Sequence, residues 1–153
     1  MFHIVLVHPQ IPPNTGNIGR LCVNTGATLH LVRPLGFDVS DKAVRRAGLD
    51  YWERLRPVVW ESLEAFLEAA DPAKLHLATT KAAKSHFEAR YEAGDYLLFG
   101  SETEGLPGWL LERFWGQAVK IPMCEEGRSL NLAVSAGIVL YEAIRQNREK
   151  FCR

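Results

Sequence analysis

The sequence has few cysteines, no net charge and no long apolar run. Its three cysteines show no CxxC spacing, which excludes a disulfide-built scaffold and predicts free thiols in a reducing, cytoplasmic compartment. The N-terminal apolar run Phe2–Val7 stops at His8, far short of the ~20 residues of a membrane span, so we expect a soluble protein. Eighteen Lys and Arg balance eighteen Asp and Glu, which argues against nucleic-acid binding by bulk charge but not against local basic patches.

Several chemistry-bearing motifs are also missing. The five histidines have neither HxxxH nor HExxH spacing, so we expect no metal ion. No GxGxxG, Walker or GxSxG motif occurs, which disfavours a dinucleotide-binding protein, an ATPase and an α/β-hydrolase.

What remains is a globular composition in a chain of domain size. Apolar residues make up 47% of the 153 positions and charged residues 24%, so we expect residues 1–153 to form a single domain with a sizeable core. Short apolar runs alternate with helical patterns. This alternation predicts an α/β fold, with a mostly parallel sheet and helices on both faces.

The expected elements follow from apolar periodicity and from Pro, Gly and capping residues. The predicted strands are Phe2–Val7, Thr28–Val32, Val58–Trp60, Lys74–Thr79, Tyr96–Phe99 and Ala118–Ile121. The predicted helices are Asn14–Asn24, Asp41–Ala47, Ser62–Ala70, Pro107–Phe114 and a long one from Ser129. The segment Ala82–Gly94 has no regular pattern and is predicted to be a mobile surface loop.

The first segment that could carry chemistry is Pro12–Arg20, which follows the first strand. Open α/β sheets bind ligands at the carboxyl ends of their strands. Asn14 is the expected N-cap of the helix. Arg20 lies within the first two turns, where a cation opposes the helix dipole. Such an arginine either answers a carboxylate or phosphate or is an ordinary snorkelling side chain, and the pattern alone favours neither.

The second segment, Leu97–Pro107, runs from a strand into a loop flanked by Gly100 and Gly105. Glycines permit unusual backbone conformations and close approaches, so main-chain groups of this loop could lie against a flat ligand. Glu102 binds a hydroxyl, pairs with an arginine, or is a solvated acid in a tight turn. For this motif alone the tight turn is the more common case.

The third segment, Ile121–Leu132, combines an apolar lip with a predicted helix start. Ser129 is the expected N-cap, with Leu130 and Asn131 in the first turn, where free N–H groups could bind a ligand. Asn131 makes either a structural hydrogen bond or a ligand contact, and taken alone the structural bond is favoured.

A local basic cluster is formed by Lys42, Arg45 and Arg46, and Tyr51 and Trp52 follow it. Cations beside aromatic rings suit phosphate contact and base stacking, although a solvated face explains the pattern equally well.

Taken together and in this order, the three segments resemble the three motifs of the SPOUT superfamily of knotted RNA methyltransferases. The matching stretches are Asn14–Arg20, Phe99–Leu106, Ile121–Met123 and Ser129–Leu132, with further matches at Arg45–Tyr51 and Thr79–Lys81. The chain is similar to the small branch that 2′-O-methylates the wobble nucleotide of leucine tRNAs. One departure is Ala133, where related sequences often carry a polar residue, which puts one peripheral hydrogen bond in question.

The resemblance implies a C-terminal trefoil knot that holds S-adenosylmethionine, and a homodimer that binds tRNA across both subunits. The cofactor-binding positions that it implies are Ala78, Thr79, Gly100, Glu102, Gly105, Ile121, Met123, Ser129 and Leu130. The first and last helices would form the dimer interface through Ile18, Leu21, Ile138 and Tyr141, unless these side chains belong to the monomer core. A tRNA-binding protein of zero net charge must concentrate its cations, and the candidates are Lys42, Arg45, Arg46, Lys81 and Lys84.

The resemblance also implies a catalytic centre that contains Arg20, Asn14, Glu102, Ser129 and Asn131. Arginine stays protonated in proteins, so we expect Arg20 to orient the ribose and stabilise a developing alkoxide rather than to act as a general base. Three alternatives remain open: methylation of another tRNA or rRNA position, a non-catalytic knotted RNA-binding protein, and a small-molecule α/β enzyme.

Overall fold

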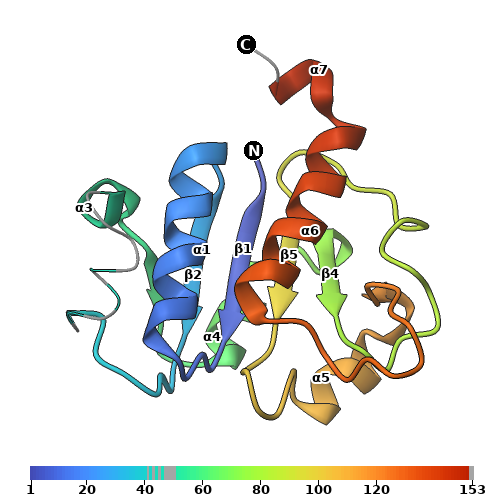
Figure 1. The fold of residues 1–153 in the computed structure, drawn as a ribbon, viewed down its shortest axis with the longest axis horizontal. Coiled ribbons are helices and arrows are strands. Elements are labelled where there is room, and N and C mark those ends of the chain that lie inside the picture. The colour runs from blue at the N-terminus through green and yellow to red at the C-terminus, as the bar shows by residue number, and fades with distance from the viewer. Residues whose placement is uncertain (41, 43, 45, 47–50, 152–153) are drawn as a thin grey trace.

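All strands of the sheet run in the same direction. The computed structural model describes residues 1–40, 42, 44, 46 and 51–151 (Figure 1). Its six-stranded sheet has the order β3-β2-β1-β5-β4-β6, and each pairing is parallel. The strands are β1 (His3–Val7), β2 (Thr28–Val32), β3 (Val58–Trp60), β4 (Leu75–Ala78), β5 (Tyr96–Phe99) and β6 (Ala118–Val119).

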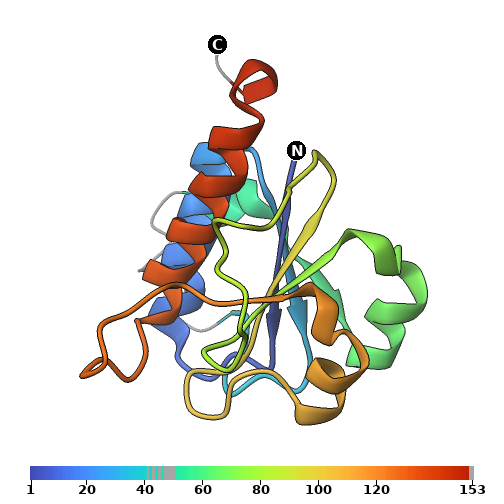
Figure 2. The same ribbon diagram turned by 90° about the vertical axis from the view of Figure 1, so that its right-hand side faces the viewer.

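Helices cover both faces of this sheet, which confirms the predicted α/β architecture. Figure 2 shows α1 and α6 on one side of the sheet and α4 and α5 on the other. The helices are α1 (Pro12–Thr25), α3 (Trp52–Leu55), α4 (Leu63–Ala69), α5 (Gly108–Arg113), α6 (Leu132–Gln146) and α7 (Arg148–Phe151). Within the described ranges, none of these helices has the length and apolar character needed to cross a bilayer.

The sheet separates two apolar cores, and β1 contributes to both. Ile4 and Leu6 pack with α1 and α6, whereas Val5 and Val7 pack with α4 and α5. Successive side chains of a strand point to opposite faces, so a strand covered on both sides must be apolar throughout. This is why the β1 sequence shows no polar alternation.

Two helix starts differ from the predictions. Helix α1 begins at Pro12 rather than Asn14, because proline suits the first turn of a helix, and the Asn14 side chain is engaged elsewhere. Helix α6 begins at Leu132, and its N-cap is Asn131 rather than Ser129: the Asn131 Oδ1 accepts from the N–H groups of Ala133 and Val134. The predicted cap of α4 by Ser62 is confirmed.

The predicted mobile loop is packed against the protein body. As predicted, it contains neither helix nor extended strand. However, four of its side chains are buried, and two of these join the core beneath α6; the four are Ala82, His86, Ala89 and Tyr91. The predicted helix Asp41–Ala47 falls largely outside the described residues.

Three side chains from neighbouring strands, His3 of β1, His30 of β2 and Trp60 of β3, form a row of hydrogen bonds. The Trp60 indole N–H donates to His30 Nδ1 at 3.1 Å, and His30 Nε2 lies 2.9 Å from His3 Nδ1. Indole can only donate, so His30 must carry its hydrogen on Nε2 and donate it to His3. Burial lowers the pKa of His30 to about 4, and the charge of His3 acts in the same direction.

The hydrogen-bonded histidines predict that the free energy of unfolding falls on acidification at pH values above those at which carboxylates titrate. Unfolded His30 binds a proton near its ordinary pKa of 6.5 and folded His30 only near pH 4, so protonation favours the unfolded state in between. We expect His30 to lower the free energy of unfolding by about 2 kcal/mol from pH 7 to pH 5. Urea denaturation at both pH values measures this, and His30→Phe should show a smaller difference. Equal pH dependence in wild type and variant would contradict the prediction.

Candidate functional site

The three sequence segments converge on one cleft at the carboxyl edge of the sheet. This cleft has a volume of about 430 Å³ and lies where β4, β5 and β6 end and α1 and α6 begin. It is lined by all nine residues predicted to bind a cofactor, and also by Asn14, Asn131 and Lys81. Segments more than a hundred positions apart in the chain thus form one site, as strand ends of a parallel sheet do.

The carboxylate of Glu102 joins the second segment to the first. Its Oε1 accepts from the backbone N–H of Gln10 at 2.9 Å, and its Oε2 accepts from the backbone N–H of Ile11 at 2.6 Å and from the Asn14 Nδ2 at 3.2 Å. These donors lie at the N-terminus of α1, where the helix dipole favours a negative charge. Glu102 therefore neither pairs with an arginine nor stands free in solvent.

Asn14 joins both of these segments to the third. Its Oδ1 accepts from Asn131 Nδ2 at 3.0 Å while its own amide N–H group donates to Glu102. Because Asn131 also caps α6, one line of hydrogen bonds runs from the β5 loop through α1 to the start of α6. Asn131 makes the structural hydrogen bonds that the sequence alone favoured, and because it also lines the cleft, a ligand contact stays a prediction.

The loop after β5 folds back on itself at two glycines. A Cβ on Gly100 would lie 1.9 Å from the carbonyl carbon of Gly105, so no larger residue fits there. Gly105 has a φ of +70°, a conformation that glycine adopts without strain. The close approach that the glycines permit is therefore between two parts of the loop, and it brings Glu102 over the start of α1.

The cleft walls are part apolar and part polar. Sequence reasoning missed several lining residues, namely Ile11, Thr80, Phe99, Ser101, Thr103, Glu104, Leu106, Leu111, Leu132 and Ser135. Most of them are sequence neighbours of predicted positions, and this adjacency is the feature of the sequence that could have indicated them. Gln10 was missed outright, although Thr103 Oγ1 donates to its side chain at 2.7 Å. Ser129 and Leu130 line the cleft as exposed residues ahead of α6 rather than within its first turn.

Arg20 is the one predicted catalytic residue that does not line this cleft. It is exposed on α1, and its guanidinium lies over the Tyr51 ring at 5.8 Å from the centroid. Among the described residues, no carboxylate lies within ion-pair distance of it. The guanidinium is thus exposed and has no ion-pair partner among the described residues.

The structure describes most of the other residues that were predicted to contact RNA or to lie beside such contacts. Lys84, Lys42 and Arg46 are exposed, whereas Arg45 lies outside the described residues. Trp52 is buried with its ring packed against Gly19 of α1, so neither base stacking nor a solvated face, the two interpretations left open, applies to this residue.

Metal and thiol chemistry find little support in the described part of the chain. No three His, Cys, Asp or Glu side chains converge there as a metal site would require. Burial raises the pKa of the Cys22 thiol to about 12, which keeps it protonated and unreactive.

A parallel sheet with a part-apolar cleft at its carboxyl edge, where hydrogen bonds join three distant loops, is the architecture of a ligand-binding protein of the α/β class. Comparison with known proteins gives the family. A model described as the SpoU rRNA Methylase family matches residues 1–141, and the chain belongs to this family of methyltransferases.

Related proteins cover nearly the whole chain. The tRNA (cytidine(34)-2′-O)-methyltransferase of Aeromonas hydrophila is 50% identical over 147 residues, which are 95% of this chain and 94% of that protein. The Escherichia coli K12 protein of the same name is 49% identical with the same coverage.

Two solved structures are informative. One, described as giving structural insights into the 2-OH methylation of C/U34 on tRNA, is 46% identical, with a TM-score of 0.93 and 97% coverage of each chain. The SpoU methyltransferase AviRb from Streptomyces viridochromogenes, in complex with AdoMet, is 28% identical with a TM-score of 0.83. The match covers 96% of this chain and 60% of AviRb.

The carboxylate of Glu102 should contribute to folding through its three donors. We expect Glu102→Gln to lower the free energy of unfolding by about 1–3 kcal/mol, because an amide must turn its N–H₂ toward one of those donors. Urea denaturation measures the change. Glu104→Gln, in the same loop but with no hydrogen bond to its carboxylate among the described residues, should stay within about 0.5 kcal/mol of wild type. Equal stability of the two variants would refute the role of Glu102.

Proposed function

We propose that this protein is an S-adenosylmethionine-dependent tRNA 2′-O-methyltransferase that modifies the ribose of the wobble nucleotide, position 34, in leucine tRNAs. The observation that carries the proposal is the hydrogen-bonded line from Glu102 through Asn14 to Asn131 along the cleft. The names of the relatives that match almost the full chain support the tRNA substrate and position 34. A cytidine or a modified uridine is the expected base, and leucine tRNA follows from the sequence resemblance.

The cleft suits S-adenosylmethionine by size and by chemistry. Its volume of about 430 Å³ lies within the usual range of ligand pockets, ~300–1,000 Å³. Ile121, Leu106 and Leu130 offer apolar surface to a purine, and Thr79 and Ser129 offer polar groups to an amino-acid moiety. When bound, this cofactor would supply the methyl group of its sulfonium to the ribose 2′-oxygen; the sulfur–methyl bond would break to leave S-adenosylhomocysteine, and the hydroxyl proton would pass to solvent.

The protein contributes chiefly by alignment and by stabilising charge. The hydrogen-bonded line from Glu102 through Asn14 to Asn131 holds the walls of the cleft in position. Positioning of two reactants can lower the activation barrier of a reaction by roughly 7–11 kcal/mol. Arg20, permanently protonated, would orient the ribose and its phosphate and stabilise negative charge developing on the 2′-oxygen.

The exposed position of Arg20 supports a homodimer in which Arg20 of one subunit serves the cleft of the other. The sequence resemblance implies a dimer through α1 and α6. Tyr141 on α6 is 52% exposed, Val134 is also exposed, and Leu21 and Ile138 are half-buried, which supports such an interface. Ile18, a predicted interface residue, is wholly buried in its own subunit and is not available for it. The trefoil knot, the cytoplasmic location and a single domain over residues 1–153 are part of the same proposal.

Incubation with radiolabelled S-adenosylmethionine and total tRNA tests this function. We expect label on the ribose of nucleotide 34 of leucine tRNAs, identified by nuclease mapping of the labelled species. Label in a base, or in a ribose outside the anticodon, would overturn the assignment. Cofactor binding by calorimetry without any transfer would instead indicate a non-catalytic RNA-binding protein.

Arg20→Ala should bind the cofactor like wild type but fail to transfer the methyl group in single-turnover assays, because the cleft is intact and the cation is lost. A co-expressed mixture of Arg20→Ala with Asn14→Ala subunits should regain transfer, since each mixed dimer pairs one intact cleft with one intact arginine. Near-normal transfer by Arg20→Ala alone would refute its role. Failure of the mixture to regain transfer would place Arg20 in its own subunit's site.

A further inference from the structure

Phe87 is the most exposed large apolar side chain in the described part of the chain, with 62% of its surface accessible. It lies in the segment between β4 and β5, and the proposed function gives Phe87 itself no role. A phenylalanine this exposed leaves a flat aromatic face in water, which favours a partner that can stack on it.

The fold brings Phe87 close to the cleft. Ser85 pairs with Lys120 in a parallel bridge, and the His86 N–H donates to the Lys120 carbonyl at 2.8 Å. Lys120 directly precedes Ile121, which lines the cleft. The turn that carries Phe87 is therefore tied by backbone hydrogen bonds to the chain beside the apolar lip of the cleft.

The backbone that carries Phe87 is held in a tight turn. Ser85 and Glu88 close the turn: the Glu88 N–H donates to the Ser85 carbonyl at 3.0 Å, and the Ser85 N–H donates to the Glu88 carboxylate at 3.0 Å. The Phe87 N–H donates to the Ser85 Oγ at 3.2 Å. Little conformational entropy is then lost when a ligand binds the ring, because the turn is already ordered.

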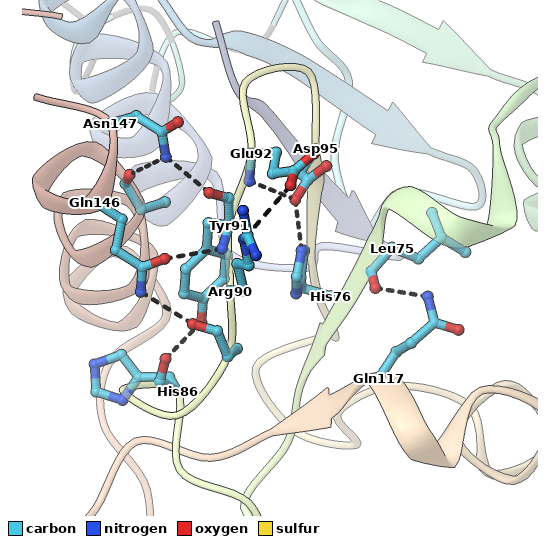
Figure 3. Close-up of polar contacts among 12 residues, drawn as sticks. Leu75, His76, His86, Arg90, Tyr91, Glu92, Asp95, Gln117, Gln146 and Asn147 are labelled. Atoms are coloured by element: carbon cyan, nitrogen blue, oxygen red, sulfur yellow. Dashed lines mark hydrogen bonds and ion pairs between the residues drawn. The ribbon is translucent and has the colours of Figure 1, made fainter. Parts of the chain in front are cut away.

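The residue beneath Phe87 is anchored from two sides. The His86 ring is 1% exposed, and its centroid lies 4.0 Å from that of Phe87. Figure 3 shows the Tyr91 hydroxyl, which donates to the His86 carbonyl at 2.9 Å, and Gln146 of α6, whose side chain accepts from the Tyr91 N–H. Asn147 donates to the Tyr91 carbonyl in the same view. These contacts fix the aromatic platform to α6.

The charges around the turn favour a polyanion. Lys81 and Lys84 are exposed in the same segment, and Lys120 is half-buried across the bridge. The one carboxylate in the turn, Glu88, is directed back to the Ser85 N–H. Cations interleaved with an exposed aromatic ring are typical of sites that bind single-stranded nucleic acid.

We propose that Phe87 stacks on an unpaired base of the RNA substrate, next to the nucleotide presented to the cleft. The inference rests on the proposed function, since it specifies how the same site holds its RNA. Phe87 supplies the stacking face, Lys81 and Lys84 contact the flanking phosphates, and the hydrogen-bonded turn holds the ring in place.

The test measures RNA affinity with side chains that differ in their stacking ability. The probe is a leucine tRNA transcript with cytidine at position 34, bound in the presence of S-adenosylhomocysteine. We expect Phe87→Leu, which is apolar but not flat, to bind it roughly 5- to 30-fold more weakly, and Phe87→Trp to bind like wild type. Affinity for S-adenosylmethionine, measured by calorimetry, should be the same in all three proteins. With 2-aminopurine at position 33 or 35, wild type and Phe87→Trp should quench its fluorescence and Phe87→Leu should not.

Trp109→Leu is the matched control. Trp109 is 45% exposed but borders the carboxylates of Glu64 and Glu68 in a groove beside α4, so its loss should leave RNA affinity unchanged. Wild-type affinity in Phe87→Leu, with methylation intact, would overturn the stacking role alone. A wild-type protein that binds the cofactor but no tRNA would overturn the proposed function and the stacking role together. A loss of dimer mass in Phe87→Leu would show that the ring faces a second copy instead.

Discussion

The cleft depends on one carboxylate, that of Glu102, which joins the loop after β5 directly to the start of α1 and, through Asn14, to the start of α6. Glu102 accepts hydrogen bonds from the backbone at Gln10 and Ile11 and from the Asn14 side chain, and Asn14 in turn accepts one from Asn131. A negative charge at the N-terminus of α1 is favoured by the helix dipole. The same contacts fix where α6 begins, because Asn131 is its cap.

The two faces of the sheet divide the proposed tasks of the protein. On one face, α1 and α6 carry the catalytic arginine and the exposed side chains of the proposed dimer interface, and α6 also holds the segment that bears Phe87. On the other face, α4 and α5 complete the second core. The cleft opens at the carboxyl edge of the sheet, where β4, β5 and β6 end and α1 and α6 begin.

Gln146 and Asn147, at the C-terminal end of α6, fix the segment between β4 and β5 to the protein body. Gln146 and Asn147 satisfy backbone groups of a segment that forms no helix or extended strand of its own. Without such partners, the buried polar groups of that segment would be costly. These hydrogen bonds therefore hold an irregular segment in place, which the proposed stacking role of Phe87 requires.

Much of this protein could be determined from the sequence alone. Short continuous apolar runs and helical stripes depend on local chain geometry, so the parallel α/β class, the six strands and the cap at Ser62 were predictable. The cleft residues were predictable because residue types such as Gly100, Glu102 and Asn131 occur in recognisable motifs.

Only the tertiary structure decided which partners those residues have. Asn14 caps nothing and instead bridges two loops, Ser129 gives up the α6 cap to Asn131, and Trp52 is buried against α1. Each of these outcomes depends on groups far away in the chain, and hydrogen bonding and burial across that distance leave no periodic trace in the sequence.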